Sequence, residues 1–122
     1  MYVIGKRFCF SASHQLDHLP AGHQCARLHG HNYQVEVLLA HDSLDSFGMV
    51  ADFGRLDPVR DYVDQVLDHR HLNEVLDGPA TSEYLAWHLY EWCRANLDLE
   101  LVLRLHGVRV AETDTSWAEY RP

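Results

Sequence analysis

Two long segments of the chain alternate apolar and polar side chains with a period of two, the pattern of a strand with one buried face. In residues 2–14 the apolar face ends at His14, and in residues 29–41 the apolar face begins with His29 and His31. The apolar side chains on the two faces are Phe8, Phe10, Ala12, Tyr33, Val35, Val37 and Leu39. Histidine at one end of both faces predicts two neighbouring strands that bring imidazoles together.

Two helices are predicted between these strands and the C-terminal segments. The first begins with Asp57 as N-cap and Pro58 at the first helical position, where a missing N–H costs nothing. The second begins with Thr81 as N-cap and runs to about Asn96. The apolar stripes comprise Val59, Val63, Val66 and Leu67 in the first helix and Leu85, Leu89 and Trp92 in the second. One apolar side on each helix indicates that both pack against the sheet.

The rest of the chain is predicted to be mainly β-structure. Residues 99–105 and 108–112 are rich in β-forming side chains and are separated by Gly107, and residues 116–120 add a short edge piece. The order strand, strand, helix, helix, strand, strand predicts an α+β domain with the helices on one face of an antiparallel sheet. No repeat or linker divides residues 1–122, so we expect a single domain.

Composition excludes several classes of partner. A net charge of −8 without a basic run argues against nucleic acid, because phosphate neutralisation needs clustered Lys and Arg. No stretch is apolar for long enough to span a bilayer, and the first residues lack the regions of a signal peptide. Three cysteines are an odd number at irregular spacing, which favours a reducing compartment over a disulfide framework. We therefore expect a cytoplasmic protein that acts on a small molecule.

The histidines predict a zinc site. His29 and His31 flank Gly30, so in a strand both imidazoles project from one face, and His14 on the neighbouring strand supplies a third nitrogen. Neutral imidazoles suit Zn²⁺, and three protein ligands with an open fourth position are typical of catalytic sites. A lone histidine is more often structural, but two apolar faces that end in histidine are hard to explain by packing alone.

Other polar residues allow two interpretations each. Cys25 is either a fourth zinc ligand or a thiol whose proton transfer an adjacent metal favours. Asp68 beside His69 is either an acid/base pair or an exposed helix end. Glu112 has the same parity as Val108 and Val110, so it is expected to face inward. Its carboxylate either accepts hydrogen bonds from two N–H groups on the guanidine-like edge of a ligand or pairs with an arginine.

The string GHQCARLHGH at residues 22–31 resembles the signature of the 6-pyruvoyl-tetrahydropterin synthase and 6-carboxy-tetrahydropterin synthase family. Further matches in order along the chain are FSASH at 10–14, GMVADF at 48–53, LDHRHLN at 67–73, PATSE at 79–83 and VAET at 110–113. The resemblance implies a T-fold, with a four-stranded antiparallel sheet and two helices on one face. It also implies a homo-oligomer, commonly a hexamer of two trimers, with active sites between subunits.

The resemblance also implies roles for individual residues. It makes His14, His29 and His31 zinc ligands, Cys25 the catalytic cysteine, Asp68 and His69 the acid/base pair, and Glu112 the carboxylate that anchors the pterin. Thr81 and Ser82 fall where the family places hydroxyl contacts to the ring, although Ala80 interrupts the usual Pro-Thr junction. Lys6, Arg7 and Arg27 are candidate triphosphate contacts on charge grounds alone.

The implied reaction converts 7,8-dihydroneopterin triphosphate to 6-carboxy-5,6,7,8-tetrahydropterin, with release of acetaldehyde and triphosphate, in the biosynthesis of queuosine and other deazapurines. The compact spacing around Cys25 favours this branch over 6-pyruvoyl-tetrahydropterin formation, which eliminates triphosphate and keeps the three-carbon side chain. A non-catalytic zinc scaffold, with Cys25 as fourth ligand, is the hypothesis from a different functional class.

Overall fold

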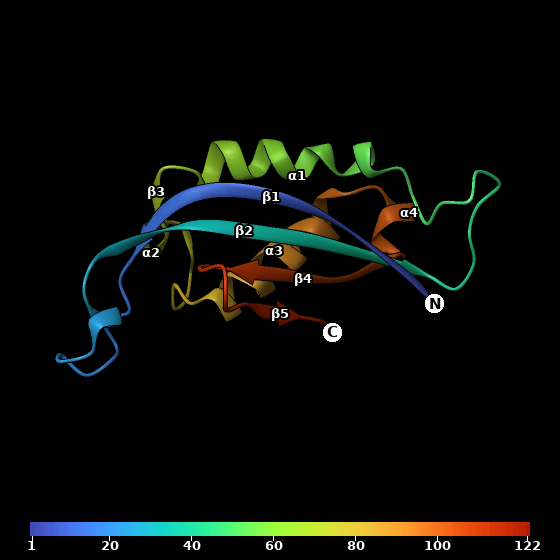
Figure 1. Ribbon diagram of the computed structural model, residues 1–122. Coiled ribbons are helices and arrows are strands. Elements are labelled where there is room, and N and C mark those ends of the chain that lie inside the picture. The colour runs from blue at the N-terminus through green and yellow to red at the C-terminus, as the bar shows by residue number, and fades with distance from the viewer.

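The computed structural model describes all 122 residues as a curved sheet with helices along one side (Figure 1). The strands are β1 (Tyr2–His14), β2 (His29–His41), β3 (Arg70–His71), β4 (Leu105–Ala111) and β5 (Ala118–Tyr120). Their order in the sheet is β3-β1-β2-β4-β5, and every pairing is antiparallel except that of β3 with β1. The α+β class is confirmed. A single strand, β4, runs through Gly107, which was expected to separate two strands; β5 is the expected edge piece, and the two-residue β3 was not expected.

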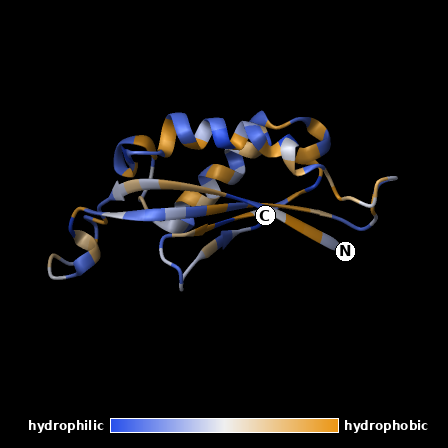
Figure 2. Ribbon diagram, turned by 45° about the horizontal axis from the view of Figure 1, so that its top comes forward, coloured by the Kyte–Doolittle hydropathy of each residue, from blue (hydrophilic) through white to orange (hydrophobic).

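The helices lie on one side of this sheet, as Figure 2 shows with the sheet seen below them. The longest is α3 (Ser82–Asn96), which Thr81 caps by accepting a hydrogen bond from the Tyr84 N–H, as predicted. The other helical elements are η1 (Gln24–Ala26), η2 (Phe53–Leu56), α1 (Asp57–Tyr62), η3 (Val63–Leu67), α2 (Leu72–Val75) and α4 (Leu99–Val102). None of the helices is long and apolar enough to cross a membrane.

The core lies between the helices and the inner face of the sheet, which we define as the face toward the helices. Along β1 the side chains of Phe8, Phe10 and Ala12 are buried there, and the alternation continues to His14, which is 1% exposed. The residues between them, such as Ser11 and Ser13, point to the opposite side, which we call the outer face. This alternation puts the predicted histidines at the end of the hydrophobic core.

Two further local predictions are wrong. Asp57 is not a helix cap: Asp52 accepts from Gly54 N–H and starts η2, which runs directly into α1. Residues 99–102 form helix α4 rather than a strand, because the Asp98 carboxylate accepts a hydrogen bond from Leu101 N–H. In both places a capping carboxylate set the local structure, and residue propensity did not.

Candidate metal centre and active site

Strand pairing brings three histidines together at one end of the sheet. In the β1–β2 register His14 lies opposite His29 and Ala12 lies opposite His31, so all three imidazoles lie on the inner face. One ring nitrogen from each lies within 4.8 Å of the other two, close enough for the three to hold one metal ion. His14 Nε2 and His29 Nε2 are 2.8 Å apart. We call this group the three-histidine cluster.

Backbone carbonyls orient two of these rings. His14 Nδ1 lies 2.6 Å from the Ala80 carbonyl oxygen, and His29 Nδ1 lies 2.6 Å from the Arg27 carbonyl oxygen. A carbonyl can only accept, so both Nδ1 atoms are donors and both Nε2 atoms of the neutral rings carry lone pairs. Two lone pairs 2.8 Å apart repel unless a cation lies between them. The arrangement therefore fits a metal ion bound through Nε2.

His31 completes the cluster with an unpartnered nitrogen. Its Nε2 lies 2.9 Å from Glu112 Oε2, but the angle is unsuitable for a hydrogen bond, so this buried nitrogen has no hydrogen-bond partner. Burial lowers the pKa of His31, against an opposing effect of Glu112, and favours the neutral imidazole that metals bind. A buried polar atom without a partner is rare in a protein, and a metal ion would supply that partner.

Glu112 lies beside this cluster, directly after β4. Its Oε1 accepts a hydrogen bond of 2.9 Å from Ser82 Oγ at the start of α3, and its Oε2 also lies 3.5 Å from His14 Nε2. The carboxylate is 30% exposed, so a ligand can reach it. A small cavity next to it is lined by Ser82, Glu83, Glu112, Ser116 and Trp117. Glu112 faces inward as its parity predicted, and no arginine pairs with it.

Asp68 and His69 form a second polar group at the sheet edge. Asp68 Oδ1 accepts from Ser11 N–H at 3.0 Å, and Asp68 Oδ2 lies 2.9 Å from His69 Nδ1. The Ser11 N–H, followed by the His69 side chain, holds the pKa of Asp68 below its ordinary value. His69 adopts a φ of +59°, and its own N–H donates to the Ser11 carbonyl. A non-glycine residue held at positive φ is typical of functional sites.

The other residues predicted for the site make different contacts. Cys25 is half-buried in η1, between the two long strands, and does not join the metal-binding group. Thr81 Oγ1 is occupied as the helix cap, whereas Ser82 Oγ contacts Glu112. Arg27 contributes its carbonyl oxygen to His29, a role that side-chain patterns do not reveal.

Sequence reasoning missed two contributors to this site. The carbonyl of Ala80 orients His14, and Trp117 lines the cavity beside Glu112 with 59% of the residue exposed. A backbone carbonyl leaves no mark in residue type, so the first has no sequence signal. An aromatic residue five positions after an inward carboxylate was available as a signal for the second.

Comparisons with known proteins find relatives that match nearly the whole chain. The family model of 6-pyruvoyl tetrahydropterin synthase matches residues 3–122. The 6-carboxy-5,6,7,8-tetrahydropterin synthase of Synechocystis is 42% identical over 98% of this chain and 93% of its own length. The Bacillus subtilis protein of the same name is 34% identical over 99% and 86%. A Pyrococcus furiosus relative, 34% identical over 80% of this chain and 83% of its own length, is named dihydroneopterin monophosphate aldolase.

The fold agrees with that of solved structures. The 6-pyruvoyl tetrahydropterin synthase of Caenorhabditis elegans superposes with a TM-score of 0.83, at 25% identity, over 99% of this chain and 95% of the other. This likeness confirms the T-fold, in which the sheet and its helices form the unit described above. The sequence matches and the superposition each span nearly the whole chain. The chain therefore belongs to the 6-pyruvoyl tetrahydropterin synthase family.

Proposed function

We propose that this protein is a zinc-dependent 6-carboxy-5,6,7,8-tetrahydropterin synthase that acts on 7,8-dihydroneopterin triphosphate in queuosine biosynthesis. The observation that carries the proposal is the three-histidine cluster, with two lone pairs 2.8 Å apart and a carboxylate beside it. Relatives of 42% and 34% identity bear that enzyme's name. All three cysteines are free, which supports a cytoplasmic location.

The donor set favours zinc. Neutral imidazoles suit Zn²⁺, and three protein ligands leave a position for substrate. Bound zinc would withdraw charge from a substrate hydroxyl and ease its deprotonation.

Glu112 and the acid/base pair supply the remaining chemistry. The Glu112 carboxylate, positioned by Ser82, receives N–H groups from the amidine edge of the pterin. Asp68 keeps His69 oriented through Nδ1, so that Nε2 takes and returns a proton at the substrate side chain. Cys25, on the loop before His29, provides a second group that exchanges protons.

We further propose that the active site is shared between copies in a homo-oligomer, as a hexamer of two trimers. The three-histidine cluster lies on the inner face of β1 and β2, whereas Asp68 binds the backbone N–H of Ser11 at the edge of the sheet where β3 pairs with β1. His69 is 82% exposed at the edge of the sheet, beyond β1. The acid/base pair thus lies at an exposed sheet edge, where a second copy can bring its own cluster to it.

The test is incubation of the zinc-loaded protein with 7,8-dihydroneopterin triphosphate, with products followed by mass spectrometry. Acetaldehyde with a 6-carboxy product is expected. A pyruvoyl product without acetaldehyde would assign the other branch of the family. A different cleavage product would point to the aldolase activity for which the Pyrococcus relative is named.

Cys25→Ala separates catalysis from a zinc scaffold. Because Cys25 lies outside the three-histidine cluster, we expect the variant to keep its zinc and lose turnover. Cys9→Ala is the matched control, since Cys9 is an exposed cysteine on the outer face of β1. Loss of zinc in Cys25→Ala, without any turnover of the wild type, would support the scaffold.

A further inference from the structure

One asparagine side chain binds both polar backbone groups of the residue that follows His14. Asn73 Oδ1 accepts a hydrogen bond of 2.9 Å from the Gln15 N–H, and Asn73 Nδ2 donates one of 2.7 Å to the Gln15 carbonyl oxygen. A carboxamide carries both an acceptor and donors, so this one side chain satisfies the backbone of Gln15 as a neighbouring strand would. We call these two hydrogen bonds the Asn73 clamp.

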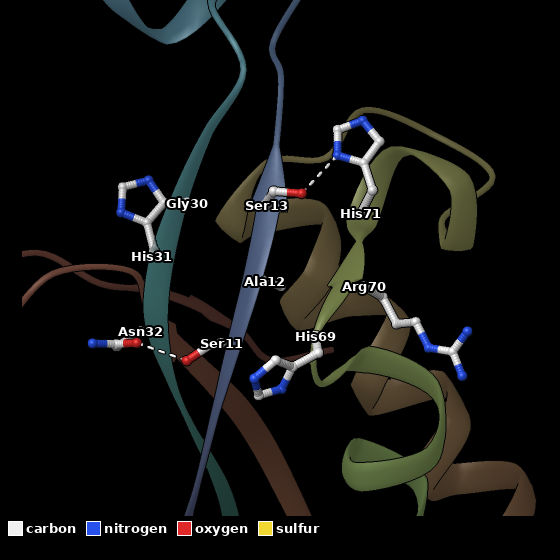
Figure 3. Close-up of a pocket in the computed structure, with 9 residues that line it drawn as sticks. All are labelled: Ser11, Ala12, Ser13, Gly30, His31, Asn32, His69, Arg70 and His71. Atoms are coloured by element: carbon white, nitrogen blue, oxygen red, sulfur yellow. Dashed lines mark hydrogen bonds between the residues drawn. The ribbon is translucent and has the colours of Figure 1, made fainter.

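The Asn73 clamp lies where β1 leaves the sheet. The β1–β2 register ends with His14 opposite His29, and the β1–β3 register ends with Ser13 opposite His71. Neither register reaches Gln15, whose backbone groups would be left to water without the clamp. Figure 3 shows β3 beside β1, with a further contact of 2.9 Å between Ser13 Oγ and His71 Nδ1. His14 thus lies between two residues that are both bound to β3 and the start of α2.

The helix that contains Asn73 does not account for these contacts. Helix α2 has four residues, and its N-cap, His71, makes no side-chain hydrogen bond to it. Asparagine side chains ordinarily bind backbone groups in their own turn. Asn73 instead reaches a residue 58 positions away in the chain. Its side chain therefore serves the end of β1 rather than the helix in which it lies.

Two candidate ligands depend on this end of β1. Strand β2 pairs with β4 only between Gln34 and Leu39, so at His29 the one neighbouring strand is β1. A displacement of the end of β1 would therefore move His14 directly and His29 through its pairing. Fixing the backbone beside His14 thus helps to keep both Nε2 atoms in place.

We propose that Asn73 is a positioning residue for the metal centre, which acts by fixing the backbone that carries His14. The inference rests on the proposed function, because it takes the three-histidine cluster to hold zinc. The Ala80 carbonyl, 2.6 Å from Nδ1, orients the His14 ring, which is 1% exposed. Zinc–nitrogen bonds are about 2.0–2.1 Å long and tolerate a deviation of about 0.2 Å. To meet that tolerance the backbone of the ligand must be held as well as its ring, and the Asn73 clamp holds it.

The experiment measures metal binding by Asn73→Ala, which removes both hydrogen bonds of the clamp. Zinc affinity is measured by competition with a chromophoric chelator, and Co²⁺ is the second probe, because its visible absorption reports the coordination geometry. Loss of a contact that orients a metal ligand typically lowers metal affinity by about 10- to 100-fold. We expect about tenfold, because Asn73 acts on His14 through the backbone. The Co²⁺ absorption should change in intensity or in wavelength.

Asn96→Ala is the matched control. Asn96 Nδ2 also donates to a backbone carbonyl, that of Trp92 at 2.9 Å, but at the C-terminal end of α3. Its zinc affinity should stay within about twofold of the wild type, with the same Co²⁺ spectrum. Asn73→Asp is the second variant, since it keeps the side-chain shape and the acceptor for the Gln15 N–H and loses the donor. Its zinc affinity should also fall, and it decides the test if Asn73→Ala does not fold.

The Tm of the metal-free and zinc-loaded proteins separates positioning from a general structural role. A purely structural clamp would lower both Tm values equally in the Asn73 variants and leave zinc affinity and the Co²⁺ spectrum unchanged, which would overturn this inference alone. Equal losses of zinc affinity in Asn73→Ala and Asn96→Ala would also overturn it. A wild type that binds zinc but turns over no pterin would overturn the proposed function and leave the role of Asn73 standing, whereas one that binds neither ion would overturn both.

Discussion

The hydrogen bond from Ser82 to Glu112 offers a direct test of the pterin anchor. Ser82 is 6% exposed and donates through Oγ at 2.9 Å to Oε1, the carboxylate oxygen that does not face the histidines. Ser82→Ala removes this donor without altering the N-cap, which belongs to Thr81. The carboxylate then keeps its charge but loses the contact that orients it for the pterin edge.

The magnitude follows from the exposure of the carboxylate. A hydrogen bond to a charged group contributes about 1.5–3 kcal/mol when buried. Glu112 is 30% exposed, so water replaces part of the lost contact, and we expect a loss of about 1 kcal/mol, or about fivefold in pterin affinity. Zinc content should not change, because Oε2 and the three histidines are untouched.

The assay is equilibrium titration of 7,8-dihydroneopterin against the wild type, Ser82→Ala and Ser116→Ala. Ser116 lines the same small cavity but pairs with Thr113 rather than Glu112, which makes it the matched control. Unchanged affinity in Ser82→Ala, or an equal loss in both variants, would refute the reasoning that Ser82 positions the anchor.

Three further predictions concern stability. Removal of the metal with a chelator should lower the Tm, because the bound ion relieves the repulsion between His14 and His29, and re-addition of Zn²⁺ should restore it. Differential scanning calorimetry measures both changes, and an unchanged Tm would contradict the prediction. Burial lowers the pKa of His88, whose Nε2 lies 2.6 Å from the Tyr62 hydroxyl, so the free energy of unfolding should fall as the pH drops below about 6.5. Urea titrations at several pH values should show a shallower fall in His88→Gln. Leu89→Ala should cost about 2–5 kcal/mol in the same titrations, since Leu89 is fully buried, and a cost below about 1 kcal/mol would exclude close packing there.

Local residue pattern was sufficient to predict the two long strands and the face on which their histidines lie. Period-two alternation is a local property of the backbone, so the parity that buries Phe8 and Phe10 also assigns His14 to the inner face. The cap at Thr81 was equally local, because one side chain binds the N–H three residues later. For the same reason the zinc ligands and the inward position of Glu112 could be proposed from the order of residues alone.

Local pattern was less informative where two signals competed. The β-forming residues 99–102 became helix α4, and the first helix starts one short turn before its expected cap. In each place a carboxylate, Asp98 or Asp52, satisfies an N–H that begins a turn, and propensity is too weak to outweigh it. The two-residue strand β3 was also missed, because a strand this short has no period to detect.

Which groups meet in the site depends on contacts between segments far apart in the chain. The β1–β2 register brings His14 and His29 within 2.8 Å, and the Ala80 carbonyl, 66 residues along the chain from His14, orients that ring. The placement of Asp68 depends on a backbone N–H of Ser11, 57 residues away, which holds Asp68 and His69 at the β3 edge of the sheet. Residue types and spacings specify local chemistry, whereas contacts between distant segments depend on how the strands pair and how the loops close.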